Sequence, residues 1–118
     1  MSATVLKFLG RFQVWSYSVS HGQLLLRSPK SRERATQVDI LFKNVASMQL
    51  PAMFDDIEIR KVRADELPSA PQLGALESMG REIYRITGRN VDGYVVAGAV
   101  VADERNLEYD AVSPLLQM

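Results

Sequence analysis

The chain has 118 residues, 47% of them hydrophobic, and this length fits a single domain built around one core. Fourteen basic residues balance fourteen acidic ones, so nucleic-acid binding is disfavoured, whereas self-association as a homodimer is only weakly opposed. The absence of cysteine excludes disulfides, thiolate metal sites and a cysteine nucleophile; it favours a reducing compartment, and we expect a cytoplasmic protein.

The first element that the sequence predicts is a β-hairpin. Residues 12–19 alternate with a period of two, and a glycine-containing turn leads into residues 23–27. Gly22 suits this turn because glycine tolerates a positive φ. The alternation places Trp15 and Tyr17 on one face of the strand. There they could fill a barrel core or form an aromatic recognition surface.

A cluster of basic residues follows the hairpin, with four positive charges in eight positions. On a loop, such residues can bind phosphate or an acidic protein surface through charge-assisted hydrogen bonds. The alternative is a solvated loop that discourages aggregation at a sheet edge. No aromatic residue lies within the cluster, so the stacking used by single-stranded nucleic-acid binders is missing there. The candidate partner-binding or ligand-binding residues are therefore Arg27, Lys30, Arg32 and Arg34, together with Trp15 and Tyr17.

Two more strands are predicted in the middle of the chain. Residues 36–43 alternate, which indicates one buried face and one solvated face. The apolar face comprises Val38, Ile40 and Phe42, and the polar face comprises Gln37, Asp39 and Lys43, with Leu41 as the exception. Residues 57–62 form a second, shorter strand with isoleucines directed inward.

Residues 64–81 do not alternate with a period of two. They predict an inserted loop with one short helix. Apolar residues are spaced three apart from Leu73 to Met79, as on one face of a helix. Pro71 suits the first helical position, and Gly80 suits the position just past the helix end. Too few residues follow to form a second core, so we expect a single domain over residues 1–118.

The last third of the chain predicts a meander of three strands over residues 82–87, 94–102 and 107–112. Residues 94–102 are apolar on both faces, as in a central strand, and are about half as long as a membrane-spanning helix. We therefore expect no membrane segment. Residues 107–112 alternate with acidic residues, as in an edge strand to which a partner could add.

The predicted elements define a mainly β fold with a minor helical part. About seven strands joined by mostly short connections favour a small antiparallel barrel, half-barrel or roll. We expect the short helix to close the roll.

The sequence offers no catalytic or metal-binding pattern. His21 is the only histidine and falls in the predicted turn without acidic neighbours in sequence. Asp55 and Asp56 belong to a small acidic group, but it does not have the spacing of a calcium-binding loop. We predict no catalytic residue, no metal and no cofactor.

These observations favour a non-catalytic protein-interaction module that joins a partner, or a second copy of itself, through a sheet face or edge. The alternative is a β-barrel protein that binds a small ligand or an anion, either inside the roll or beside the basic cluster. A small enzyme is the third interpretation. It would have to bring acids such as Asp39 or Asp56 together with His21 or an arginine across strands.

Overall fold

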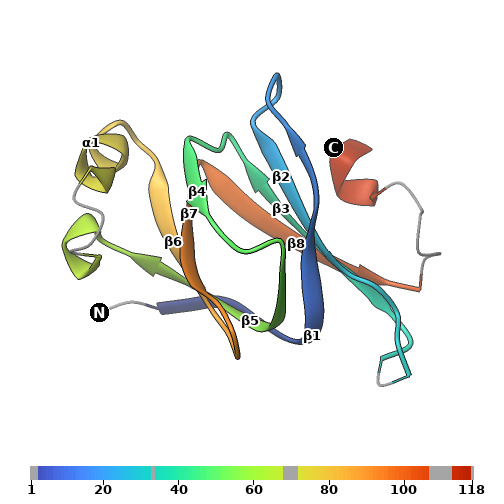
Figure 1. Cartoon of the computed structure of the whole chain (residues 1–118). Coiled ribbons are helices and arrows are strands. Elements are labelled where there is room, and N and C mark those ends of the chain that lie inside the picture. The colour runs from blue at the N-terminus through green and yellow to red at the C-terminus, as the bar shows by residue number, and fades with distance from the viewer. Residues whose placement is uncertain (1–2, 33, 68–71, 107–112, 118) are drawn as a thin grey trace.

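The computed structural model describes residues 3–32, 34–67, 72–106 and 113–117 (Figure 1). Over these residues the fold is mainly β, as predicted, with eight strands in one antiparallel sheet. The strands are β1 (Ala3–Ser18), β2 (Gln23–Ser28), β3 (Gln37–Lys43), β4 (Ser47–Gln49), β5 (Met53–Val62), β6 (Glu82–Thr87), β7 (Asp92–Ala97) and β8 (Ala99–Arg105). The helical elements are η1 (Ala64–Glu66), α1 (Leu73–Ser78) and η2 (Pro114–Gln117).

The sheet curls into a half-barrel or roll. Its strands follow the order β4-β7-β6-β5-β1-β2-β3-β8, and within the described residues no ladder pairs β4 with β8. The chain nevertheless connects the two ends, because β3 continues into β4 and β7 continues into β8. Two backbone hydrogen bonds of 2.8 Å hold this corner, from Gly98 N–H to the Lys43 carbonyl and from Ala46 N–H to the Val96 carbonyl.

The main core fills the concave side of the curled sheet. The predicted apolar face of β3 is confirmed, because Val38, Ile40 and Phe42 are all buried there. Phe12 stacks on Phe54 with ring centroids 6.3 Å apart, which fastens β1 to β5. Burial of these side chains is the main source of stability for a sheet without disulfides.

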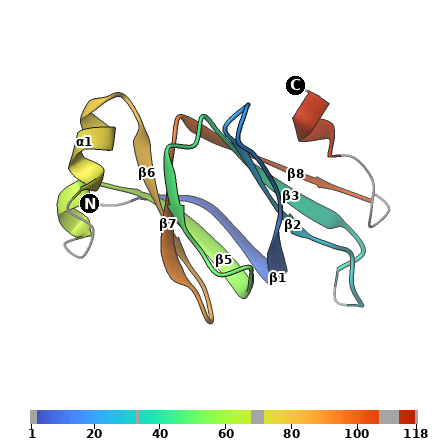
Figure 2. The same ribbon diagram turned by 45° about the horizontal axis from the view of Figure 1, so that its top comes forward.

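The predicted helix is present, but it does not close the roll. Leu73 of α1 is buried in a separate cluster with Val62, Ile83 and Val96, and this cluster covers the outer face of β6 and β7. Figure 2 shows α1 beside β6, on the far side of the molecule from the C-terminal helix. Pro71, predicted as the first helical residue, lies outside the described residues.

The strand predicted over residues 94–102 is two strands. The chain bends at Gly98, so that β7 pairs with β4 and β6 while β8 pairs with β3. A Cβ at Gly98 would lie 3.2 Å from the Cβ of Asn44, so the glycine permits the close approach at this corner. The strand predicted at residues 107–112 lies outside the described residues.

The polar face of β3 is buried, contrary to the prediction that it faces water. Leu115 of η2 packs on Leu25 and Leu41, and this C-terminal element covers the outer face of β2 and β3. Gln37 and Asp39 are consequently buried on that face. The same contact explains Leu41, the apolar exception on the polar face.

Trp15 and Tyr17 do not share a face, contrary to the prediction. The β1–β2 register shifts between Val14 and Ser16, which marks a β-bulge. Trp15 packs beside Leu25 in the outer cluster, whereas Tyr17 pairs with Leu24, a residue of the main core.

Candidate functional site

The predicted basic cluster separates into residues with different environments. Arg27 is fully buried, contrary to the prediction of a basic residue available for binding. Its Nε and Nη2 donate hydrogen bonds of 2.8 and 3.2 Å to the two carboxylate oxygens of Asp39. Its guanidinium also lies 4.7 Å from the ring centroid of Trp15. Arg27 and Trp15 therefore act in the packing of the sheet rather than in a surface site.

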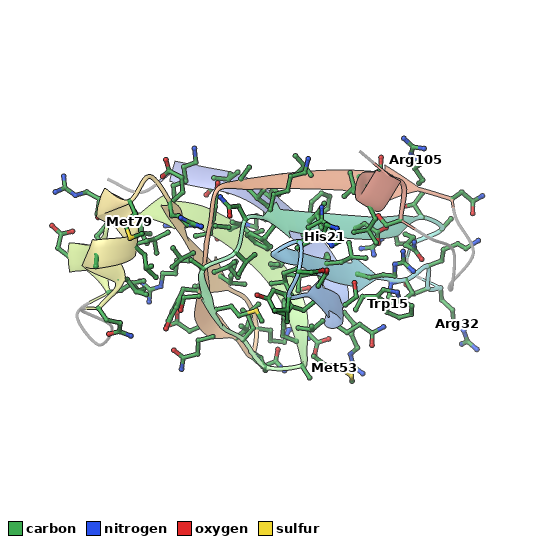
Figure 3. All side chains as sticks on the ribbon, turned by 90° about the horizontal axis from the view of Figure 1, so that it is seen from above. Trp15, His21, Arg32, Met53, Met79 and Arg105 are labelled. Carbon is green, nitrogen blue, oxygen red and sulfur yellow. The ribbon has the colours of Figure 1, made fainter. Side chains whose placement is uncertain are left out.

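Arg32 and Tyr17 are exposed, and neither lines the two hollows described below. Arg32 lies at one extreme end of the molecule, away from the sheet (Figure 3). Tyr17 lies near the β1–β2 turn, which holds His21.

Arg34 is held rigidly by four hydrogen bonds. Its guanidinium donates to the carbonyls of Leu9 (2.5 Å), Ser28 (3.0 Å) and Thr36 (3.1 Å), and to the Ser28 hydroxyl (2.6 Å). All of these partners are neutral, so no carboxylate among the described residues compensates its charge. Gly10 has a φ of 116°, a conformation that L side chains rarely adopt, which explains glycine at this position in β1.

Lys30 and Arg34 line an open cleft of about 820 Å³ on the outer surface of the sheet. The cleft crosses β1 at Gly10 and is bounded by the loop after β2, the start of β5 and the β6–β7 turn. Two further basic residues line it, Arg11 and Arg89, neither of which the sequence analysis selected. We call this site the β1 cleft.

Two acidic residues of β5, Asp55 and Asp56, line the β1 cleft. Arg11 contacts Asp55 at 3.2 Å, and Arg89 contacts Asp56 at 3.5 Å. Asp56 has a φ of 64°, and its side chain accepts a 2.9 Å hydrogen bond from Gly10 N–H. This bond holds β1 to β5 where their register shifts.

The two ion pairs of the cleft join exposed arginines to partly buried aspartates. The side chains of Arg11 and Arg89 are 66% and 76% exposed, whereas those of Asp55 and Asp56 are partly buried. Exposed ion pairs of this kind contribute about 0–1 kcal/mol. Either arginine can therefore leave its aspartate for a competing anion at little cost.

The apolar part of the cleft consists of Leu9, Pro29 and Met53. Leu9 is 70% exposed and Met53 is 49% exposed, which is unusual for large apolar side chains of a small domain. The arrangement combines an apolar floor with two more basic than acidic side chains. It can hold a ligand that has both an anionic group and an apolar surface.

A smaller hollow of about 290 Å³ adjoins the cleft and shares Leu9, Asp56 and Arg89 with it. Glu58 lies at this hollow. A hydrogen bond from the Thr4 hydroxyl (2.6 Å) and another from Arg60 hold the pKa of Glu58 below its ordinary value. Glu58 therefore remains ionised at neutral pH.

The described residues contain no group of three or more metal-ligating side chains placed to hold a metal ion. His21 Nδ1 lies 3.1 Å from the hydroxyls of both Ser18 and Ser20 on an exposed turn. Among the described residues, no carboxylate accepts a hydrogen bond from His21 and so orients the imidazole for catalysis. None of the described helices is long and apolar enough to cross a membrane.

Comparisons of the chain with protein-family models, with curated proteins and with solved structures found no match.

Proposed function

We propose that this protein is a non-catalytic protein-interaction module, and that the β1 cleft receives an anionic group of its partner. The observation that carries the proposal is the guanidinium of Arg34. It is fixed by neutral hydrogen-bond acceptors on three backbone carbonyls and one hydroxyl, and it lines the cleft. A cation held in this way is preorganised for an anion, because little side-chain freedom is lost when the anion binds.

The surroundings of Arg34 support a protein partner. Leu9 and Met53 offer exposed apolar area next to the charge, and protein interfaces combine apolar anchors with arginine. Arg11 and Arg89 can exchange their aspartates for acidic side chains of the partner. The absence of cysteine supports a reducing location such as the cytoplasm.

The test captures partners from a lysate of the source organism with tagged wild-type protein, Arg34→Met and Arg32→Met, followed by mass spectrometry. Arg32 is the matched control because it is an exposed arginine of the same loop outside the cleft. We expect a stoichiometric partner that the wild type and Arg32→Met retain and that Arg34→Met loses. Thermal unfolding of all three proteins checks that Arg34→Met remains folded. Equal capture by both variants, or the lack of any stoichiometric partner, would contradict the proposal.

A small anionic ligand is the second candidate, because the volume of the cleft falls within the range of about 300–1,000 Å³ typical of ligand pockets. Titration with tripolyphosphate, monitored by thermal shift, tests it. A saturable rise of the melting temperature that Arg34→Met removes and Arg32→Met keeps would favour this function over the first.

A further inference from the structure

The N-terminal half of β1 is a sheet edge. Residues 3–13 of β1 pair with β5 on one side, but β2 pairs with β1 only from Gln13 onward. β2 ends at Ser28, and Pro29 then leads the chain away into the loop. Within the described residues, the position beside residues 3–11 that β2 would occupy if it continued holds no strand. In Figure 1 this half of β1 runs along the lower margin of the molecule next to β5.

The side chains along this edge are exposed on the outer surface. Leu6 and Phe8 pack against the core, whereas Val5, Lys7 and Leu9 are exposed. Natural edge strands are usually protected by charged residues, bulges or very short length. Lys7 and two irregularities in the β1–β5 register, one at Val5 and one between Phe8 and Arg11, interrupt this edge in part. Residues 6–8 between them pair regularly with β5.

The edge ends at Arg34. The carbonyl of Leu9, which has no partner residue on β5, accepts the hydrogen bond from Arg34 Nη1. The guanidinium therefore lies at the end of the vacant strand position, where the chain leaves the sheet after β2. A strand added beside residues 3–8 would meet a fixed positive charge at that end.

We infer that the partner binds as an added β-strand along residues 3–8 of β1, and that an acidic side chain of this strand binds Arg34. This inference rests on the proposed function and identifies the occupant as an extended, acidic segment of a partner protein. Backbone hydrogen bonds to the β1 edge would supply affinity, and the charge at Arg34 would fix the register. Apolar side chains of the segment would lie beside Val5 and Leu9, which are exposed on this strand.

Charge complementarity favours an acidic segment over a neutral one. The two adjoining hollows next to this edge are lined by more basic than acidic residues, namely Lys7, Arg11, Lys30, Arg34 and Arg89 against Asp55, Asp56 and Glu58. Asp55 and Asp56 oppose a ligand carboxylate only weakly, because each already contacts an arginine. An acidic residue at the Arg34 end therefore reduces the excess of positive charge.

The test selects binders from displayed random peptides of about 12 residues, long enough for one strand, with the full-length protein as bait. We expect the selected peptides to combine an acidic residue with alternating β-branched residues. Each peptide is then resynthesised with single N-methylated amides, which remove one hydrogen-bond donor at a time without altering the protein. Because alternate amides of an added strand face β1, methylation in one register should weaken binding about tenfold and in the other about twofold or less.

Amide hydrogen exchange provides the second readout, since an added strand should slow exchange within residues 5–9 of β1. Selected peptides that bind without register dependence, or that protect another strand, would overturn the inference. If such peptides still require Arg34 and tolerate Arg32→Met, the proposed function stands and only the strand addition is wrong. If they bind Arg34→Met as tightly as the wild type, both are wrong. A library that yields no acidic binder also contradicts the inference.

Discussion

Arg27 of β2 and Asp39 of β3 face each other across the sheet as a fully buried ion pair joined by two hydrogen bonds. The pair lies on the outer face, where η2 covers β2 and β3, and not in the main core. The Trp15 ring lies against the same guanidinium. The buried positive charge of Arg27 is thus balanced by the carboxylate of Asp39 on the neighbouring strand and by the face of the Trp15 ring.

We predict that Asp39→Ala destabilises the fold by about 3–5 kcal/mol, because it leaves the Arg27 guanidinium buried without its counter-ion. Asp65→Ala is the matched control, since it removes an exposed ion pair with Arg63 and should cost about 1 kcal/mol or less. Urea unfolding measures both free energies. A similar loss for the two variants would show that burial adds nothing to the Arg27–Asp39 pair.

The C-terminal helix η2 should contribute stability through Leu115. Leu115→Ala removes a buried side chain that packs on Leu25 and Leu41, and we expect a loss of about 2–3 kcal/mol. The neighbouring Leu116 is partly exposed, so Leu116→Ala should cost less than about 1 kcal/mol. Urea unfolding again gives both values, with the fluorescence of Trp15 as the probe. Loss of less than about 1 kcal/mol for Leu115→Ala would mean that η2 does not cover this face in solution.

Gly88 lets the β6–β7 turn approach β5 beneath the β1 cleft. A Cβ there would overlap the carbonyl oxygen of Asp56 and lie 2.9 Å from that of Asp55. Gly88→Ala should therefore destabilise the protein by about 1–3 kcal/mol. Gly74→Ala in α1 is the matched control, because the new Cβ would meet only that of Ala64 at 3.8 Å. It should stabilise the fold by about 0.5–1 kcal/mol. Thermal unfolding that moves both variants in the same direction would contradict this packing.

Arg85 donates hydrogen bonds of 3.1 and 3.0 Å to the two carboxylate oxygens of Asp92, and these bonds hold the pKa of Asp92 below its ordinary value. A carboxyl group with a lower pKa in the folded chain stabilises the fold at neutral pH. That contribution disappears as the pH falls through the folded pKa. Its size is small because both side chains are exposed.

We expect Arg85→Met to raise the pKa of Asp92, so that this carboxyl titrates at higher pH. Carboxyl chemical shifts followed by NMR from neutral to acidic pH measure the change. Glu58, whose pKa is lowered by Thr4 and Arg60, is the internal control and should titrate as before. An unchanged pKa for Asp92 would show that the Arg85 contact is absent in solution.

Local pattern was sufficient to predict much of the sheet. The first hairpin is confirmed, with a φ of 59° at Gly22 in its turn. The alternation of residues 36–43 correctly identified the core face of β3, because one buried face imposes a period of two whatever the topology. The short helix within residues 64–81 is confirmed as well, since its apolar spacing and its glycine end are local signals.

Contacts between distant segments explain the errors. The local pattern predicts that Asp39 faces water. Its burial depends on two residues distant in sequence, its ion-pair partner Arg27 and Leu115 of η2, and no local pattern reveals either of them. The β-bulge near Trp15 changes which face the ring occupies without changing the alternation of residue types. Gly98 was a visible interruption, but its role as a corner depends on the pairing with Lys43.

Only some of the residues that line the β1 cleft could be predicted from the sequence. Lys30 and Arg34 could be predicted because they belong to a cluster of basic residues in the sequence. Arg11 and Arg89 are single basic residues in separate elements, and the sequence does not link them to this cluster. The available signal was Gly10, a glycine inside a long strand, which indicates a bulge or a close approach. Only the pairing of β1 with β5 brings these residues together.

Isothermal titration of the captured partner into wild-type protein, Arg34→Lys and Arg32→Lys measures whether Arg34 binds an anionic group of the partner. Both substitutions keep a positive charge, but only Arg34→Lys removes the guanidinium that four hydrogen bonds hold at the β1 cleft. We expect Arg34→Lys to weaken binding about tenfold or more and Arg32→Lys to change it about twofold or less. Equal affinity of the two variants for the partner would contradict the claim.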